Sequence, residues 1–361
     1  MKGPKDETLA RVIRERVVTG RMKPGTRLPN RVELLKEHDV SPQTLQRALD
    51  RLVREGFVVP RGRAGTFVTN RPPHLHRIAL IFPNSPPASD NRFFSALQMV
   101  AQDVANERDR TLLTFHGIDG HIDSPEYARL EEDVVRHRVA GMIFATNPSV
   151  LYGSPVLHEP DVPRVAFAAT GLANVATVFP DFVQLARRAL HRLAEMGAKR
   201  IGVIVHHSIS PEIVNEWLGD LQSLGLQTRP EWKIGLSVYA PGWVGSAMHL
   251  LMDRPPADRP DGLLILDDHL VEPALSALQK LGIIPGRAIH IVAHNNFPLP
   301  LAPEHQITRI GFDARQMLEK CFELINTQRT SDPINSESLM IAPFFEEEVI
   351  RVTPVLLPPH R

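Results

Sequence analysis

The sequence has 361 residues, and its 41 Lys or Arg are balanced by 41 Asp or Glu, so the net charge is zero with neutral histidine. A chain of this length usually divides into two or three domains. No apolar run is long enough to cross a bilayer, and the first residues lack the apolar core of a signal peptide. The single cysteine, Cys321, excludes an intrachain disulfide and a cysteine-based zinc site. We therefore expect a cytoplasmic protein of several domains.

The zero net charge hides an uneven distribution along the chain. Residues 1–77 contain 17 Lys or Arg against 8 Asp or Glu, whereas residues 78–361 contain 24 against 33. The first segment is therefore basic by nine charges, and the second is acidic by nine. A basic end favours a partner with a phosphate backbone, bound at that end only. Basic terminal segments also occur for solubility alone.

Three helices are predicted in the basic end. Apolar residues recur at helical spacing from 9 to 17, which indicates a first amphipathic helix. Asn30 followed by Glu33 makes a capping-box pattern that opens a second helix. Ser41 can cap a third helix, for which Pro42 suits the first position.

The third helix presents polar and basic side chains outside its apolar face. Leu45, Leu49 and Leu52 lie on one side at helical spacing. The residues on or near the other side are Gln43, Thr44, Gln46 and Arg47. Side chains of these types hydrogen-bond base edges in a major groove. A helix face that is simply solvated is the alternative.

A short hairpin with a basic tip follows this helix. Two apolar stretches, 58–59 and 67–68, flank the sequence RGRAG at 61–65, whose glycines allow a tight turn. Three helices and a basic hairpin predict a winged helix-turn-helix, mainly α with a β wing. In such a unit the third helix enters the major groove of double-stranded DNA, and the wing lies against the backbone or the minor groove.

The run from 20 to 68 resembles the DNA-binding domain of GntR-type bacterial transcription regulators. It contains, in order, the motifs PG, LP, EGFV and GTFV, with helices between them. The family usually has Ser-Glu-Arg-Glu after the LP pair, where this chain has NRVE, so Val32 stands at the customary arginine and Arg31 is its expected replacement. The DNA-binding residues that this resemblance implies are Arg31, Ser41, Gln43, Thr44, Gln46, Arg47, Arg61, Arg63, Gly65 and Thr66. Pro42 and Gln46 stand where the family often has arginine, so we expect a different operator to be read.

Residues 71–76 are predicted to form a short polar linker with two prolines. It separates a DNA-binding domain at 1–70 from a second domain at 77–361. His74 and His76 within it are conceivable metal ligands. Two histidines without a third partner nearby are more often solvated, so no metal site is assigned.

Strands and helices alternate regularly from residue 77 onward. Strands are predicted at 78–82, 110–115, 141–145, 162–167, 200–205, 262–266, 288–293 and near 338–341. Helices are predicted at 93–107, 125–138, 182–196, 211–224, 243–252, 271–281 and 313–326. This order predicts an α/β fold with parallel sheets covered on both faces, and the length of the segment indicates two lobes.

This second segment resembles the effector-binding domain of LacI-type repressors, which has the fold of periplasmic sugar-binding proteins. The motifs that carry the resemblance are KRIGVI at 199–204, DGLLILDD at 261–268, LGIIP at 281–285, IVAHNN at 291–296 and ITRI at 307–310. The resemblance implies a two-lobed domain that dimerises and binds a small effector, such as a sugar or a related polar metabolite. Joining such a sensor to a GntR-type head is an arrangement known among sugar-responsive regulators.

A ligand is expected between the lobes, near the carboxyl ends of the strands. The candidate ligand-binding residues are Asn84, Phe94, Asn147, Asp181, Trp217, Asp268 and Asn295. Amides, carboxylates and aromatic rings suit hydroxyl-rich molecules, because each hydroxyl both donates and accepts. Asp268 matches a family position whose aspartate often binds sugar. Each polar candidate also has a structural interpretation, since Asp and Asn cap helices directly after strands, and tryptophans often pack between helices.

The predicted function is ligand-controlled transcription regulation, most simply repression by a homodimer on a palindromic operator. A DNA-binding protein whose large domain only dimerises or recruits partners is the alternative. An enzyme on a doubly wound fold is disfavoured, because the sequence has no nucleophile elbow, phosphate loop, dinucleotide fingerprint or zinc-protease motif. No catalytic residue, cofactor or metal is assigned.

Overall fold

The computed structural model describes residues 4–85, 91–170, 172–219, 221–240, 242–300, 306–329 and 338–348. The chain divides into two compact units. The first unit comprises Met1–Ser89, Ala101–Thr177 and Glu319–Ser338, and the second comprises Asp90–Val100, Val178–Leu318 and Leu339–Arg361. Each unit is therefore assembled from segments that are distant in the sequence. No helix among the described residues is long and apolar enough to cross a membrane.

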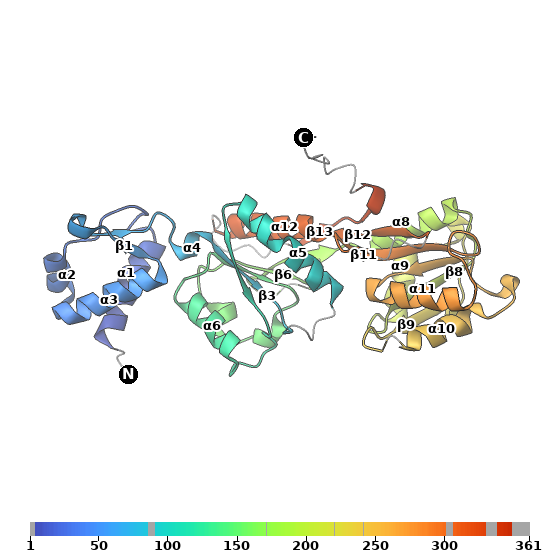
Figure 1. Cartoon of the computed structure of the whole chain (residues 1–361), viewed down its shortest axis with the longest axis horizontal. Coiled ribbons are helices and arrows are strands. Elements are labelled where there is room, and N and C mark those ends of the chain that lie inside the picture. Colours follow the sequence, from blue (N-terminus) through green and yellow to red (C-terminus); the bar gives the residue numbers. More distant parts are fainter. Residues whose placement is uncertain are drawn as a thin grey trace, which may run out of the picture. The chain divides into compact units, whose positions relative to one another are not determined.

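The basic end of the first unit is a three-helix domain with a two-stranded wing (Figure 1). Its elements are α1 (Lys5–Val18), α2 (Arg31–His38), α3 (Pro42–Glu55), β1 (Val58–Pro60) and β2 (Thr66–Val68). The strands pair antiparallel. Apolar side chains from all three helices and the wing form one core around Ile13, Leu34 and Leu52. We call this part, residues 4–69, the head.

The predicted caps of the head are confirmed. Asn30 accepts a hydrogen bond from the Glu33 amide, and Glu33 bonds back to the Asn30 amide, so the capping box is complete. The Ser41 hydroxyl accepts from the Thr44 amide, with Pro42 at the first helical position. Gly56 ends α3 at a φ of 82°, a left-handed conformation in which glycine is unstrained. The predicted winged helix-turn-helix is therefore the fold of this segment.

The α/β part of the first unit is built on one six-stranded sheet, which we call sheet one. Its strand order is β13-β7-β6-β5-β3-β4. The strands are β3 (Arg77–Ile81), β4 (Thr111–Phe115), β5 (Gly141–Phe144), β6 (Arg164–Phe167), β7 (Ala176–Pro180) and β13 (Ser338–Ile341). The pairs β3–β4, β3–β5 and β5–β6 are parallel. The helices in the segments around this sheet are α4 (Pro73–His76), α6 (Pro125–Val135) and α7 (Pro155–His158).

The second unit has its own six-stranded sheet, which we call sheet two, in the order β14-β12-β11-β10-β8-β9. The strands are β8 (Ile201–His206), β9 (Lys233–Leu236), β10 (Gly262–Ile265), β11 (His290–Phe297), β12 (Thr308–Asp313) and β14 (Phe344–Phe345). All described pairings are parallel except β12–β14. Helices α8 (Phe182–Glu195), α9 (Pro211–Leu218), α10 (Gly242–Met252) and α11 (Val271–Lys280) belong to this unit. Residues of α5 (Arg92–Glu107) and α12 (Ala314–Gln328), and of strands β7 and β13 of sheet one, are divided between the units.

Several details differ from the sequence predictions. Strands β7, β9, β12 and β14 were not among the predicted strands. The helix predicted at 211–224 ends at Leu218, because Gly219 has a φ of 58° and breaks it. The segment predicted as a polar linker contains α4, and His74 is half-buried there instead of solvated.

Candidate functional site

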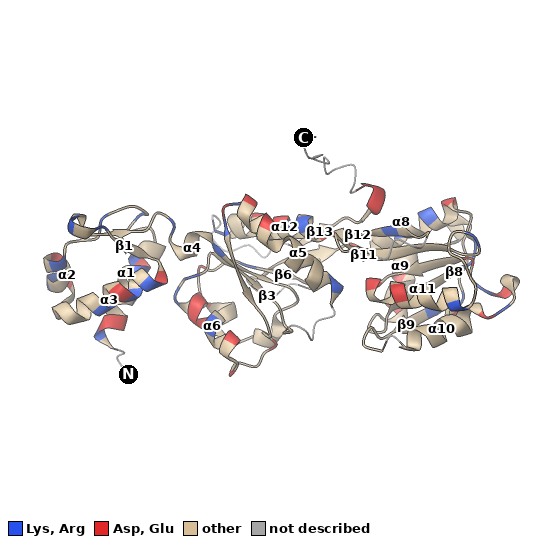
Figure 2. Ribbon diagram, in the orientation of Figure 1, with Lys and Arg blue, Asp and Glu red and all other residues tan. Residues whose placement is uncertain are grey.

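The N-terminal half of α3 is an exposed surface free of carboxylates. Gln43 and Arg47 are exposed, whereas Thr44 and Gln46 are half-buried. The first turn contains no acidic residue, and within the described chain Arg47 has no ion-pair partner. Figure 2 shows that the helices of the head carry Asp and Glu as well as Lys and Arg. The acidic residues of α3 itself, Asp50 and Glu55, lie in its second half. An arginine and amides at the start of an exposed helix can meet base edges.

Gln46 links α2 to α3. Its side-chain oxygen accepts a hydrogen bond from Arg31, and its amide nitrogen donates to Asp50 Oδ1 at 2.7 Å. The predicted DNA-binding residues Arg31 and Gln46 are therefore brought together. These two hydrogen bonds use one acceptor site and one N–H of the amide, so Gln46 keeps a second N–H that can donate to a base.

The wing places two arginines differently. The Arg61 guanidinium lies 4.6 Å from the centre of the Phe67 ring, so its stem and head cover the hairpin. Arg63 is exposed at the tip. Gly65 has a φ of 101°, and a Cβ there would lie 2.9 Å from Arg27 Nε. Arg27 therefore packs directly on the wing backbone.

Two basic residues of this surface were missed by the sequence analysis. Arg21 and Arg27 are exposed and line an open hollow of about 510 Å³ beside the start of α2. The other lining residues are Met22, Thr26, Leu28, Pro29, Asn30 and Glu33. The signal was present, since both arginines stand in the turn between the first two predicted helices, where loop residues often contact phosphate.

A cavity of about 320 Å³ lies at the carboxyl ends of β3 and β5 in sheet one. It is lined by Ile81, Pro83, Ile118, Asp119, Phe144, Thr146, Asn147, Pro148, Val150 and Leu151. We call it the sheet-one cavity. The Asn147 side chain accepts from the Ser149 amide at 3.0 Å and donates to Thr170 O at 3.3 Å. Asn84, also predicted, is exposed and is not among the lining residues.

The carboxyl ends of sheet two gather acidic and imidazole groups. Asp268 is only 2% exposed, and its Oδ2 accepts from Arg92 Nε at 3.0 Å and from the Asn296 amide groups at 3.0 and 3.2 Å. Arg92 is a partner that the sequence analysis missed, because 176 residues separate it from Asp268. Oδ2 thus already has three protein donors, whereas Oδ1 lies 3.5 Å from His269 Nδ1.

His269 and Asp267 form a second pair at this edge. The His269 ring is within 2.8 Å of Asp267 Oδ1 through Nδ1, and its Nε2 accepts from the Arg92 amide at 3.0 Å. Burial alone would raise the pKa of Asp267, but the hydrogen bonds from His269 outweigh it and hold that pKa below the ordinary value. Asp267, Asp268 and His269 are spaced closely enough to suit a metal ion. The hydrogen bonds that these three residues make with protein groups explain their close spacing without a metal ion.

His294 and Asn295 are buried next to one another on β11. His294 is 5% exposed, and within the described residues neither of its ring nitrogens has a hydrogen-bond partner. Burial lowers the pKa of His294, so the ring is neutral near pH 7. Asn295 donates to Leu299 O at 2.9 Å, and its buried side-chain oxygen is unpartnered within the same residues. These are polar atoms that a ligand could satisfy.

The remaining predicted ligand residues have structural roles in the second unit. Asp181 Oδ1 caps α8 by accepting from the Gln184 amide at 2.8 Å. Trp217 stacks on Phe182, with ring centres 5.3 Å apart and planes at 15°. Phe182 also packs against His294, at 5.7 Å. Phe94 is buried, and its amide donates to Asn91. Helix capping and packing therefore account for Asp181 and Trp217.

Two segments of the chain match known protein families. Residues 5–68 match the family described as bacterial regulatory proteins, gntR family, and residues 190–343 match a periplasmic binding protein-like domain. The arabinose metabolism transcriptional repressor of Geobacillus stearothermophilus is 21% identical, over 94% of this chain and 96% of its own. The repressor of the same name from Halalkalibacterium halodurans is 22% identical, over 89% and 90%.

Solved structures share the fold of the α/β segment. A LacI-family regulatory protein from Chloroflexus aggregans superposes with a TM-score of 0.60 at 18% identity, over 74% of this chain and 96% of its own. A LacI-family regulator from Enterococcus faecium with bound ribose gives 0.56 at 18% identity, over 75% and 96%. The CelR–cellobiose complex gives 0.56 at 18% identity, over 85% and 90%. The predicted winged helix and periplasmic-binding-protein-like fold are thus confirmed.

Proposed function

Because the chain joins a GntR-type winged helix-turn-helix head to a LacI-type effector domain, we propose that it is a transcriptional repressor whose operator affinity is controlled by a small polar ligand. The carboxylate-free start of α3, with Gln43 and Arg47 exposed, is the observation that carries the DNA-binding role. The basic surplus of residues 1–77 supports it. The relatives are transcription regulators and not enzymes.

The head is proposed to read DNA in two ways. Gln43 and Arg47 contact base edges in the major groove, and Gln46 joins them through its second side-chain N–H. Arg63 at the wing tip, and Arg21 and Arg27 beside α2, contact phosphates. A homodimer would present two heads to a palindromic operator, because half-sites mirror protein symmetry.

A sugar is the proposed effector. Two full-length relatives are named for arabinose metabolism, and fold relatives hold ribose or cellobiose. Asn147 at the sheet-one cavity, and Asp268 with the unpartnered atoms of His294 and Asn295 in the second unit, offer amide, carboxylate and imidazole groups for hydroxyls. Phe94 and Trp217 would contribute apolar or stacking contacts.

Selection of bound fragments from the source genome tests the DNA-binding role. We expect the full-length chain to enrich a palindromic sequence, and arabinose, ribose or cellobiose to weaken its binding to that sequence. Fluorescence anisotropy with labelled operator and labelled random DNA of equal length gives both affinities. Equal affinity for the two DNAs would exclude sequence-specific regulation.

A second candidate function is a DNA-binding protein whose large domain takes no ligand. The observation that favours it is the engagement of Asp268, which accepts three hydrogen bonds from protein groups at 2% exposure. Sequence-specific binding that no sugar alters, together with no thermal shift by any sugar, would select this alternative.

A further inference from the structure

Glu55, the last residue of α3, divides its two carboxylate oxygens between different parts of the first unit. Oε2 accepts from Arg14 Nη2 at 2.6 Å and from Arg14 Nε at 3.1 Å, within the head. Oε1 accepts from Arg136 Nη1 at 3.2 Å. Arg136 is the residue that ends α6. The α/β part of the unit thus reaches the DNA-reading helix itself.

Arg136 meets more than one carboxylate of the head. Its Nη2 lies 3.5 Å from Glu7 of α1, and Glu7 is in turn 2.9 Å from Arg51 of α3. Within α6, Arg136 is also 2.6 Å from Glu132. The Glu55 side chain is 3% exposed, whereas that of Arg136 is 27% exposed. We call Glu7, Arg14, Arg51, Glu55 and Arg136 the Glu55 cluster.

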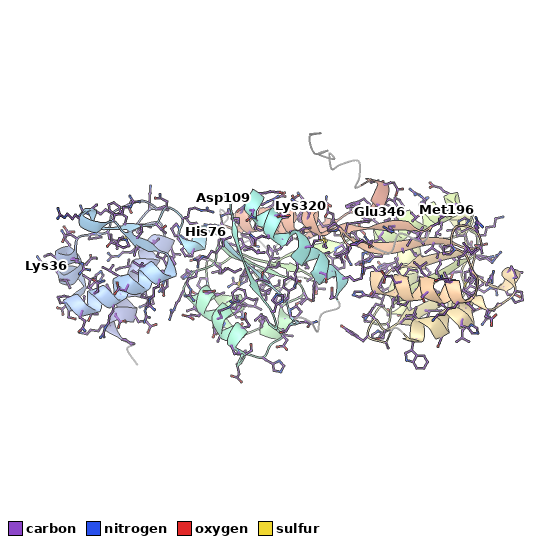
Figure 3. All side chains as sticks on the ribbon, in the orientation of Figure 1. Lys36, His76, Asp109, Met196, Lys320 and Glu346 are labelled. Atoms are coloured by element: carbon purple, nitrogen blue, oxygen red, sulfur yellow. The ribbon has the colours of Figure 1, made fainter. Side chains whose placement is uncertain are left out.

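A second contact joins the head to the same unit through α4. His74 stacks on Phe57, with ring centres 5.9 Å apart and planes at 10°. Leu75 O accepts from Arg110, and from Arg329 Nη1 at 3.3 Å. Arg71 binds Asp109 Oδ1 at 2.9 Å, and Figure 3 labels Asp109 and His76 at this junction. The segment between the head and β3 is therefore held from both sides.

Helix α6 connects the Glu55 cluster to the sheet-one cavity. The loop before α6 supplies Ile118 and Asp119 to the cavity lining, and Ser124 caps the helix by accepting from the Tyr127 amide. Tyr127, Leu130 and Val134 fix the helix to the core. Eleven residues at 1.5 Å each make a rod of about 16 Å from cavity loop to Arg136.

We propose that Arg136 is a positioning residue for the DNA-reading helix. It holds Glu55, and therefore α3, against the end of α6, and it passes a displacement of the cavity loop through α6 to the head. Loss of Arg136 leaves Glu55 Oε1 without its cationic partner, so the head gains freedom while its internal Arg14 pair persists. The first part stands on the geometry alone. The second part rests on the proposed function, since it requires a ligand.

A distance measurement on the full chain tests the first part without DNA or ligand. Spin labels at Val32→Cys and Ile122→Cys, 74% and 61% exposed, mark the head and the loop before α6. The native Cys321 is buried and will not be labelled. We expect one narrow distance distribution in the parent chain and a distribution at least about twice as broad in Arg136→Gln.

Two matched variants separate positioning from general damage. Arg129→Gln removes an arginine from the same helix, where it binds Glu126 and not the head, so the distribution should remain narrow. Arg136→Lys keeps the positive charge, so most molecules of this variant should still show the narrow distance distribution of the parent chain. Equal distributions in the parent, Arg136→Gln and Arg129→Gln chains would overturn the positioning role.

The second part is tested by operator affinity with and without the sugar that acts on the parent chain, among arabinose, ribose and cellobiose. We expect Arg136→Gln to reduce the fold-change caused by that sugar by at least about fivefold, and Arg129→Gln to leave it unchanged. A full sugar response in a variant with a broadened distance distribution would overturn transmission through Arg136. A parent chain that lacks any operator refutes the proposed function and this second part, while the distance result still decides the first.

Discussion

Arg14 and Glu55 form an ion pair in which both side chains are buried, at 7% and 3% exposure. Burial lowers the pKa of Arg14, and the hydrogen bond from Arg14 to Glu55 opposes that effect. Arg14→Ala should therefore destabilise the head by up to about 3–5 kcal/mol, the usual cost of leaving one partner of a buried pair alone, and Arg136, which keeps its contact with Glu55 Oε1, should reduce that cost. Urea denaturation followed by circular dichroism measures the change.

An exposed pair in the same domain serves as the control. Arg16 binds Glu37, and their side chains are 26% and 41% exposed. Because exposed pairs contribute little, Arg16→Ala should cost less than about 1 kcal/mol. If Arg14→Ala costs no more than Arg16→Ala, the buried pair does not stabilise the head.

His74 gives the junction a pH dependence. Burial, and then the nearby Arg329, lower the pKa of His74 to about 4, from an ordinary value of 6.5. As the pH falls, His74 therefore binds a proton in the unfolded chain at a higher pH than in the folded chain. The stability that neutral His74 provides is complete above about pH 6.5 and is lost between 6.5 and 4, by at most about 3 kcal/mol.

His74→Phe keeps a ring on Phe57 and removes the titration. We expect its melting temperature to fall less than that of the parent chain between pH 6.5 and 4.5. His76 and His137 also have pKa values lowered by burial, so some pH dependence should remain. Parallel curves for variant and parent would show that His74 does not titrate with unfolding.

Single residues were predictable where the cause is local. Asn30 and Ser41 cap helices through amides three residues ahead, so the sequence pattern contains the whole interaction. The Arg14–Glu55 pair spans 41 residues, and the Arg92–Asp268 pair spans 176. Such pairs depend on tertiary packing, which no local pattern records.

At the scale of elements, α3 and the wing should contact different parts of the DNA: α3 the bases and the wing the phosphates. Arg47 is exposed on α3, and Arg63 is exposed at the wing tip. Arg47→Ala should weaken operator binding by about 5- to 150-fold, the equivalent of about 1–3 kcal/mol, and random DNA much less. Anisotropy titrations with both DNAs measure this ratio. Equal losses would remove Arg47 from base readout.

Arg63→Ala is expected to behave differently, because phosphate contacts carry no sequence information. Its losses for operator and random DNA should be alike, and the slope of log affinity against log salt should fall by about 1. A loss confined to the operator would place Arg63 in base readout instead.

The order of most helices and strands could be predicted from the periodicity of apolar residues. The edge strand β9 and the end of α9 could not. Strand β9 lies at the end of sheet two and is mostly half-exposed, with only Ile234 and Leu236 as apolar residues. A short edge strand of this kind produces little hydrophobic signal. The sequence also indicated a longer α9, since the apolar residues continue beyond Gly219, where the backbone turns.

At the scale of the whole molecule, ligand binding should appear as stability. A sugar at about 100 times its dissociation constant adds about 2.7 kcal/mol to a protein that binds it only when folded. We therefore expect a rise in melting temperature with arabinose, ribose or cellobiose, and none with glycerol at the same concentration. Asn147→Ala should reduce the rise if the sheet-one cavity contributes to binding.

The discontinuous construction of the first unit has a consequence for synthesis. The head is complete by residue 69, but the unit also needs Glu319–Ser338, including part of α12 and the start of β13. Ribosomes add about 5–20 residues per second, and domains fold as they emerge. At these rates, about 13 to 54 seconds pass between the synthesis of residue 69 and that of Ser338. A nascent chain is expected to carry a folded DNA-binding head long before the unit that would regulate it is finished.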